Sequence, residues 1–320
     1  MRVVFFGTPD FAVPTLEALA AESNLRPLRV ISQPSRPVGR KRQLQAPPVV
    51  HAAERLGLPY EQVESVRDKE FLARLDALRP DVAVVVAFGQ IFRKRLLGLP
   101  RLGCVNLHAS LLPRHRGAAP IQAAIAHQDP TTGVTTMRMA RGLDSGPMLM
   151  SAETAIGPDE ATPGLSARLA DLGAGLMVKT LRGLDAGTLE AVEQDEDGVT
   201  YAPRLERADG RVDWRMDADA IYARHRAYTP WPGLLAHIDG KPLKLFDVDV
   251  APATTAAEPG TLLELGGGAA TDGDPAMAVA CGGGTILRIR RVQRPGKQAL
   301  TAAVFLNGER LGAGERFETP

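Results

Sequence analysis

Short apolar runs alternate with amphipathic stretches along the first half of the chain. The apolar runs are Val3–Phe6, Val82–Phe88 and Cys104–Val105, and they are bounded by Gly, Pro or Asp. The amphipathic stretches are Phe11–Ala21, Val49–Leu56 and Phe71–Leu78. A strand that is apolar at every position is typical of a parallel sheet covered by helices on both faces. The pattern therefore predicts an α/β domain with a Rossmann-like, mostly parallel sheet.

A change of pattern indicates a second domain. A helical periodicity from Pro163 to Leu184 closes the first domain, and the acidic run Asp195-Glu196-Asp197 follows in a segment typical of a linker. One further helix is expected at Ala218–Arg226. The expected strands beyond it are Leu234–Ile238, Leu243–Val250, Gly260–Glu264, Ala276–Val279 and Thr285–Val292, with hairpin turns at Gly266–Gly268 and Gly282–Gly284. We therefore expect a first domain over residues 1–188, a linker over 189–206 and a small β-barrel over 207–320.

Three polar residues with complementary chemistry follow the third apolar run. Asn106 and His108 follow it at positions i and i+2, so both point to the same side of the predicted strand. Asp144 lies further along, in Gly142-Leu143-Asp144-Ser145-Gly146. An amide and an imidazole in one space suit acyl transfer to an amine, which needs a stabilised oxyanion and a proton acceptor. Asp144 can orient the imidazole or relay its proton.

These motifs resemble the active site of the folate-dependent formyltransferases. The matching segments around the site are Asn106-Leu-His-Ala-Ser-Leu-Leu-Pro113, Gly117-Ala-Ala-Pro-Ile-Gln122 and Gly142–Gly146. Elsewhere the chain is similar to the methionyl-tRNA branch of this family at Val4–Pro14, Gln33–Arg40, Thr229–Pro232, Gly296-Lys297 and Phe305–Gly308. The resemblance thus spans both halves of the chain. Two departures are His115, where the family usually has Trp, and Ser35, where it usually has Asp.

The resemblance implies a reaction and a role for each group of residues. It implies transfer of a formyl group from 10-formyltetrahydrofolate to the α-amino group of initiator methionyl-tRNA, with Asn106, His108 and Asp144 as the catalytic residues. The expected folate contacts are Ser110, Leu111, Leu112 and Pro113, together with backbone groups of Phe88, Gly89, Gln90 and Ile91. The segment from Arg36 to Arg42 is expected to enter the tRNA acceptor stem. The C-terminal domain is expected to be OB-like and to contact tRNA.

Charge patterning adds independent support for a polyanionic partner. The formal net charge is only +1, but residues 31–53 hold four basic residues and no acid, and residues 285–300 hold five and no acid. A basic run can also be an ordinary solvated surface, so charge alone leaves both interpretations open. The expected tRNA contacts are Arg36, Arg40, Lys41, Arg42, Arg288, Arg290, Arg294 and Lys297.

Composition and motif searches exclude several other classes. Cys104 and Cys281 are the two cysteines in 320 residues, so a disulfide framework is not expected and a cytoplasmic protein, here taken as a monomer, is favoured. No signal or membrane segment is visible. Dinucleotide binding is not expected, because Gly7-Thr8-Pro9-Asp10 lacks the glycine fingerprint. A metal is not expected, because Cys104, His108 and His115 lack a fourth ligand.

Two alternatives remain open at this point. A related enzyme with the same three catalytic residues could formylate an amino sugar or hydrolyse 10-formyltetrahydrofolate. The basic Arg36–Arg42 segment and Pro230-Trp231-Pro232 argue against both activities. A non-enzymatic RNA-binding protein that inherited the fold is the second alternative. Such a protein is expected to have lost part of the Asn106, His108 and Asp144 set, which is complete here.

Overall fold

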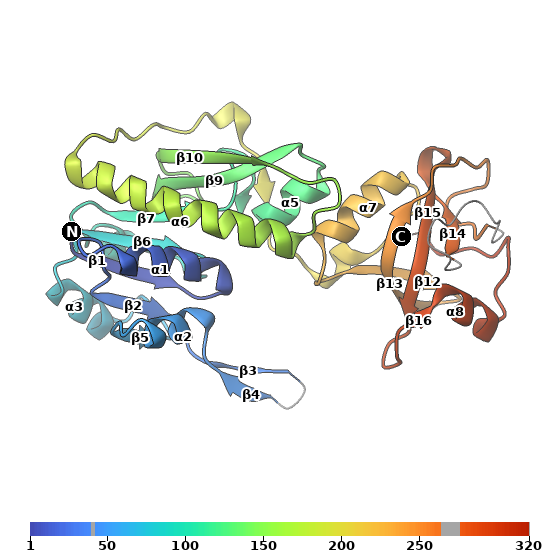
Figure 1. Ribbon diagram of the computed structural model, residues 1–320, viewed down its shortest axis with the longest axis horizontal. Coiled ribbons are helices and arrows are strands. Elements are labelled where there is room, and N and C mark those ends of the chain that lie inside the picture. The colour runs from blue at the N-terminus through green and yellow to red at the C-terminus, as the bar shows by residue number, and fades with distance from the viewer. Residues whose placement is uncertain (40–41, 264–275, 320) are drawn as a thin grey trace. The chain divides into compact units, whose positions relative to one another are not determined.

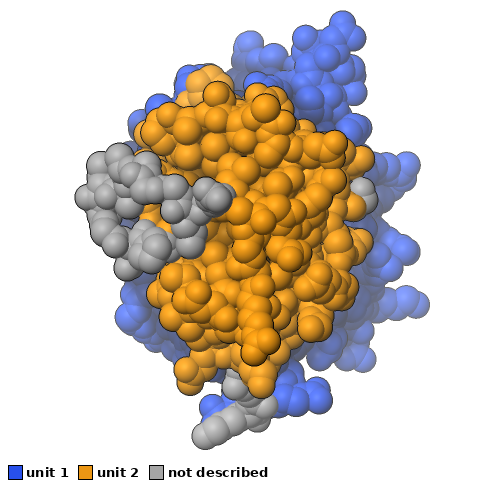
Figure 2. Space-filling model, turned by 90° about the vertical axis from the view of Figure 1, so that its right-hand side faces the viewer, with its two compact units in different colours: residues 1–121, 131–155, 164–203 blue, residues 122–130, 156–163, 204–320 orange. Residues whose placement is uncertain are grey.

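The chain forms two compact units, shown in different colours in Figure 2. The computed structural model describes residues 1–39, 42–263 and 276–319. The first unit comprises Met1–Ile121, Thr131–Ala155 and Gly164–Pro203. The second comprises Gln122–Pro130, Ile156–Pro163 and Arg204–Pro320. Across the described ranges, no helix is both long enough and apolar enough to cross a membrane.

A seven-stranded sheet forms the centre of the first unit (Figure 1). Its spatial order is β10-β9-β7-β6-β1-β2-β5. The strands are β1 (Val3–Gly7), β2 (Arg29–Ser32), β5 (Tyr60–Gln62), β6 (Val82–Val86), β7 (Cys104–His108), β9 (Thr131–Arg138) and β10 (Met148–Ala155). All neighbours are parallel from β5 to β7, whereas β9 is antiparallel to β7 and β10. Every residue of β1 and β6 is buried, which confirms the predicted mostly parallel, covered sheet.

Helices cover both faces of this sheet (Figure 1). They are α1 (Val13–Ala21), α2 (Pro48–Arg55), α3 (Lys69–Ala77) and α6 (Thr162–Ala186), with the short η1 (Asp10–Ala12) and α4 (Lys94–Leu97). Helix α5 (Pro120–Ala126) begins in the first unit, but most of its residues belong to the second. On one face, α3 begins where the Asp68 carboxylate accepts from the backbone N–H of Phe71, at 2.7 Å. Phe6, Phe71, Phe88 and Phe92 form the aromatic cluster of that face. On the other face, α6 approaches β7 so closely that a Cβ on Gly173 would lie 2.5 Å from Leu107.

Two small strand pairs extend from this sheet unit. The basic segment predicted to enter the acceptor stem is an antiparallel hairpin of β3 (Arg36–Val38) and β4 (Gln43–Gln45). The other pair is parallel and joins β8 (Arg116–Gly117) to β11 (Tyr201–Ala202). The segment expected as a linker is therefore fixed to the first unit as far as Ala202.

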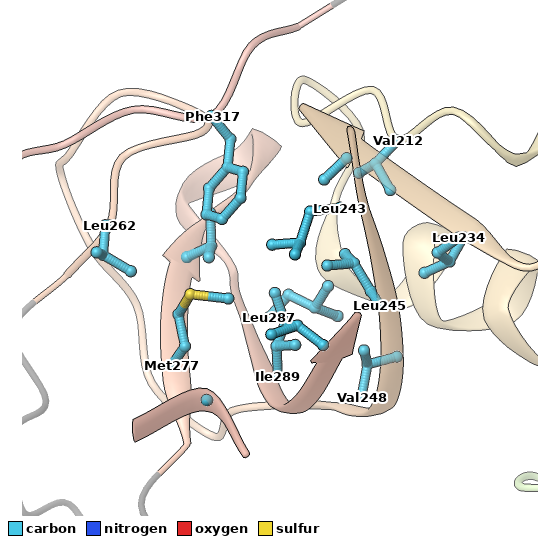
Figure 3. Packing of buried hydrophobic residues seen from close by; sticks show 14 of the residues in the cluster. Val212, Leu234, Leu243, Leu245, Val248, Leu262, Met277, Leu287, Ile289 and Phe317 are labelled. Atoms are coloured by element: carbon cyan, nitrogen blue, oxygen red, sulfur yellow. The ribbon is translucent and has the colours of Figure 1, made fainter. Parts of the chain in front are cut away.

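The second unit is built around an antiparallel sheet in the order β12-β13-β15-β14, with β16 also paired to β15. Its elements are α7 (Ala218–Ala227), β12 (Leu234–Ile238), β13 (Lys241–Val250), β14 (Met277–Ala280), β15 (Ile286–Gln293), β16 (Leu300–Thr301) and α8 (Ala302–Glu309), with the turns η3 (Arg207–Gly210) and η4 (Gly282–Gly284). Leu243, Leu245, Leu287 and Ile289 of β13 and β15 meet Met277 of β14 in its core (Figure 3). This arrangement confirms the predicted change to a second domain built of short β-strands, and its sheet is antiparallel.

The second unit differs from the sequence expectations at one strand and at one helix. The strand expected at Gly260–Glu264 is reduced to isolated bridges, Thr261 to Arg316 and Leu262 to Val279. Glu264 and the turn expected at Gly266–Gly268 lie outside the described residues. Helix α8 has no counterpart among the expected elements. It begins where the Thr301 hydroxyl accepts from the N–H of Val304, and it buries Phe305 and Leu306.

Candidate active site

The end of β7 carries two of the three expected catalytic residues. Leu107 points toward α6, so the alternation of the strand turns Asn106 and His108 to the opposite side. His108 is only 6% exposed, whereas Asn106 is half-buried. Among the described residues, no side-chain partner holds the Asn106 amide by a hydrogen bond. Its donors are therefore free for a ligand oxygen.

A backbone carbonyl fixes the protonation pattern of the His108 ring. Nε2 of His108 lies 3.0 Å from the carbonyl oxygen of His115. A carbonyl oxygen can only accept, so Nε2 must carry the hydrogen and donate it. In the neutral ring, Nδ1 is then the atom that can accept a proton. Nδ1 is 3.7 Å from Oδ2 of Asp144, a separation that lets the carboxylate stabilise the protonated ring.

Asp144 is held in an unusual backbone conformation beside His108. Its φ is +47°, in the left-handed region that residues with a Cβ adopt uncommonly, Asp and Asn more often than most. Oδ2 accepts from the backbone N–H of Gly117 at 2.9 Å. Gly146, two residues further along, is also required, because a Cβ there would lie 1.8 Å from the Arg138 carbonyl oxygen. The loop therefore directs the Asp144 carboxylate toward the imidazole.

The turn after β7 is rigid and mostly buried. The Ser110 hydroxyl donates to the Arg114 carbonyl at 2.6 Å, and the Ser110 carbonyl accepts from the Thr135 hydroxyl at 2.7 Å. Ser110 and Leu112 are buried, while Leu111 and Pro113 are half-buried. Of the four expected folate contacts here, Leu111 and Pro113 are thus the side chains accessible to a ligand. Ser110 instead maintains the shape of the turn.

The turn after β6 offers backbone rather than side-chain groups. Phe88 is buried in the aromatic cluster, and the Gln90 amide is bonded to the backbone of residues 63, 64 and 66. Gly89 is exposed with φ +84°, and Ile91 is 73% exposed. Because β6 and β7 are adjacent parallel strands, this turn and the Ser110–Pro113 turn follow the same edge of the sheet. Of the four residues expected to offer backbone contacts to a pterin, Gly89 and Ile91 are therefore the exposed ones.

Comparison with known proteins identifies the family. Residues 1–181 match the formyl transferase family, and residues 204–310 match the formyl transferase C-terminal domain. The chain belongs to the formyltransferase family. It is 46% identical to the methionyl-tRNA formyltransferase of Methylococcus capsulatus over 100% of both chains. It is also 45% identical to that of Geobacter metallireducens, over 99% of this chain and 98% of the relative.

Solved structures show the same formyltransferase fold. The sugar 3N-formyltransferase WlaRD, crystallised with dTDP and 5-N-formyl-THF, has a TM-score of 0.66 and 14% identity, over 93% of this chain and 99% of that one. HypX from Aquifex aeolicus in complex with tetrahydrofolic acid has a TM-score of 0.61 and 16% identity. That match covers 98% of this chain and 48% of HypX. At these identities the likeness concerns the fold.

The basic hairpin of this formyltransferase is tied to the turn after β6. The Gln33 amide donates to the Phe88 carbonyl at 2.7 Å and accepts from the Arg36 guanidinium at 2.6 Å. Ser35, which replaces the usual Asp, accepts from the Gln62 amide at 3.2 Å. Arg42 is exposed at the hairpin turn with φ +48°. Arg40 and Lys41, two of the expected tRNA contacts, lie outside the described residues.

The basic run of the second unit is largely committed to internal pairs. Arg288 and Arg290 of β15 both bind the carboxylate of Asp249. Arg294 pairs with Glu309 at 3.2 Å, and its guanidinium lies 5.2 Å from the centre of the Phe305 ring. Lys297 is exposed in the turn that follows β15. Of the four tRNA contacts expected here, three therefore have a role in the fold of this unit.

Gln194, which the sequence analysis does not single out, supports Arg116 beside the candidate site. Arg116 is only 3% exposed, and its guanidinium donates to Gln194 and Glu196 at 3.0 Å each. Gln194 is buried in the segment expected as a linker. These contacts also explain how the Arg116 side chain is supported when His115 replaces the usual Trp. The acidic run beside Gln194 was the available signal, but it is equally typical of a solvated linker.

The remaining reactive groups near the site favour non-covalent chemistry. Burial raises the pKa of the Cys104 thiol to about 12, so it is not a nucleophile at neutral pH. Within the described ranges, no group of three His, Cys, Asp or Glu side chains is arranged to hold a metal ion. The chemistry of the site thus centres on the amide, the imidazole and the carboxylate.

Proposed function

We propose that the protein transfers the formyl group of 10-formyltetrahydrofolate to the α-amino group of initiator methionyl-tRNA, giving N-formylmethionyl-tRNA for translation initiation. The observation that carries this proposal is the near-complete, 45–46% identical match to methionyl-tRNA formyltransferases across both units. The arrangement of Asn106, His108 and Asp144 supports it, because these groups suit formyl transfer to an amine. In this role the protein would act in the cytoplasm as a monomer.

The three side chains divide the work of acyl transfer. When the neutral amine attacks the formyl carbon, negative charge develops on the formyl oxygen, and the free amide of Asn106 is positioned to donate to it. Nδ1 of His108 accepts the proton that the amine loses, while Asp144 stabilises the resulting imidazolium. The protonated ring can then assist the formyl oxygen and return a proton to the nitrogen from which the formyl group departs. No covalent enzyme intermediate is needed.

The described residues fit a folate beside these groups. The Asn106 amide, which has no side-chain partner among the described residues, marks the place for a polar ligand atom, and the backbone of Gly89 is exposed. Leu111 and Pro113 would contact the folate on one side, and the backbone of Gly89 and Ile91 would bind its pterin on the other. When bound, the folate supplies the formyl carbon that the amine attacks.

The acceptor is assigned mainly to the hairpin. Arg36, Arg42 and the intervening Arg40 and Lys41 form a basic segment without acids, as expected of a surface that binds phosphates. Lys297 is the further candidate contact in the second unit. Arg288, Arg290 and Arg294 are weaker candidates, because nearby carboxylates already compensate their charge.

The test is a direct assay of formyl transfer. The purified protein is incubated with 10-formyltetrahydrofolate and charged initiator methionyl-tRNA, and the released amino acid is examined for N-formylmethionine. Charged elongator methionyl-tRNA, a nucleotide-linked amino sugar and buffer without an acceptor serve as controls. Formylation of the initiator tRNA in preference to the elongator is expected. Formylation of the amino sugar alone, or acceptor-independent hydrolysis alone, would overturn the proposal.

A further inference from the structure

Gln194 joins the segment after α6 to the loop that carries Asp144. Its Nε2 donates to the carbonyl oxygens of Asp144 and Gly146, both at 2.7 Å. Its Oε1 accepts from Nε of Arg116 at 3.0 Å. Carbonyl oxygens cannot donate and a guanidinium cannot accept, so these partners allow only one orientation of the amide. Both the nitrogen and the oxygen of the buried Gln194 amide are therefore hydrogen-bonded.

The same contacts hold the backbone of Asp144 and the strand whose N–H binds its carboxylate. Gln194 holds the backbone of Asp144 in its left-handed conformation by binding the carbonyls of residues 144 and 146. Arg116 immediately precedes Gly117, whose N–H binds Oδ2 of Asp144. The backbone N–H of Arg116 also donates to the Thr200 carbonyl at 2.8 Å, next to the β8–β11 pair. Gln194 and Arg116 thus link the loop of Asp144 to the strand that binds its carboxylate.

A second anchor orients the Arg116 guanidinium. Its Nη2 donates to Glu196, which is 74% exposed, while the Arg116 side chain itself is almost fully buried. With Nη2 directed to Glu196, Nε faces the amide oxygen of Gln194. Arg116 therefore holds the oxygen of the Gln194 amide, and the two N–H groups of that amide face the carbonyls of Asp144 and Gly146.

We propose that Gln194 is a positioning residue for formyl transfer, which acts by holding Asp144 in register with His108. This inference rests on the proposed function, because Asp144 must take part in proton transfer for its position to matter. Gln194 lies outside the contacts expected for folate and tRNA. Loss of the Gln194 amide is therefore expected to slow the chemical step without weakening the binding of either substrate.

The test uses the full-length protein with Gln194→Glu. This side chain has nearly the same shape and keeps an acceptor for Arg116, but it cannot donate to the carbonyls of Asp144 and Gly146 and would repel them. We expect kcat to fall about tenfold, which is less than the roughly 10²-fold cost of a 1 Å misplacement of a catalytic group. Both KM values should stay within about twofold of wild type. Glu193→Gln, at the exposed neighbouring position, is the matched control and should leave kcat unchanged.

A double-mutant comparison separates positioning from general structural damage. If Gln194 acts through Asp144, Gln194→Glu should slow an Asp144→Ala enzyme little further in single-turnover assays. An equal additional tenfold loss in that background would overturn the proposal, as would wild-type kcat in the single variant. If Gln194→Glu does not fold, Gln194→Met takes its place, since it retains length and burial without the hydrogen bonds. A crystal structure of the folded variant adds a readout that does not need activity.

The same experiments distinguish this inference from the proposed function. A wild-type enzyme that does not formylate methionyl-tRNA refutes the function itself. In that case, the crystal structure still tests the positioning role, because the bond from the Gly117 N–H to Asp144 should be lost in the variant. An unchanged Asp144 in that structure refutes the role of Gln194 whatever the substrate.

Discussion

The candidate site at the end of β7 and the charged pairs along β13 and β15 differ in how much hydrogen-bonding capacity remains unused. At the end of β7, Asn106 has no side-chain partner among the described residues, and Nδ1 of His108 faces Asp144 at 3.7 Å without a hydrogen bond. Along β13 and β15, Arg288 and Arg290 share the Asp249 carboxylate. The first place retains groups for a substrate, whereas the second uses its groups to hold two strands together.

The difference shows why a basic run is weak evidence of binding. An arginine with a carboxylate partner contributes to the fold, and its remaining charge toward a phosphate is reduced. A half-buried donor without a hydrogen-bond partner costs free energy in the unliganded protein unless water or a ligand accepts from it. Unused capacity at a buried position therefore indicates a site more strongly than the number of charges does.

The largest effect is expected at the end of β7. Replacing Asn106, His108 or Asp144 by Ala should each lower kcat by about 10² or more, since each removes one preorganised oxyanion or acid–base group. Thermal unfolding should change least for Asn106→Ala, because that side chain is half-buried, whereas His108→Ala removes a buried ring that is hydrogen-bonded to the His115 carbonyl. Pairwise variants should be less impaired than the product of the single effects. Multiplicative losses would mean that the residues act independently.

The common direction of Asn106 and His108 could be predicted from the sequence, but the contacts of Gln194 that support Asp144 could not. Asn106 and His108 are two residues apart on one strand, so their common direction follows from the period of a strand. Gln194 acts through partners that are 48 to 78 residues away in the chain. Such contacts depend on how the segments pack, and no local spacing encodes them.

The fold shows the same limit. Strands β1 and β6 were predictable because every position is apolar. Strand β9 was not, since it is rich in threonine, yet Thr135 and Thr136 are fully buried. Their hydroxyls are satisfied by Ser110 and by Thr180. Helix α8 was missed for a related reason, because Asn307 and Gly308 favour a turn while the buried Phe305 and Leu306 stabilise a helix.

The next effect tests whether the hairpin is the acceptor surface. Replacing Arg40, Lys41 and Arg42 together by Ala should raise KM for methionyl-tRNA about tenfold, because phosphate contacts are lost, and should reduce discrimination against elongator tRNA. Folate affinity should stay within about twofold. Substitution of the exposed Lys69 and Lys179 by Ala is the control for loss of charge elsewhere in the unit. Weakened folate binding with unchanged tRNA kinetics would reverse the assignment.

The smallest effect on catalysis is expected from the arginines of β15, and it sharpens the comparison most directly. Replacing Arg288 and Arg290 by Ala should lower the free energy of unfolding by about 1 to 3 kcal/mol, the value of hydrogen bonds to charged groups, because Asp249 loses both partners. Asp249→Asn should cause a similar loss. The KM for methionyl-tRNA should rise less than twofold, and the slope of log K against log salt should be unchanged. Lys297→Ala, which removes an exposed cation, should instead reduce that slope by about 0.7 to 0.9 if Lys297 contacts a phosphate. If the Arg288 and Arg290 variant reduces this slope while its free energy of unfolding stays at the wild-type value, β15 is a tRNA-binding surface. Arginines that are paired with a carboxylate would then also count as phosphate contacts.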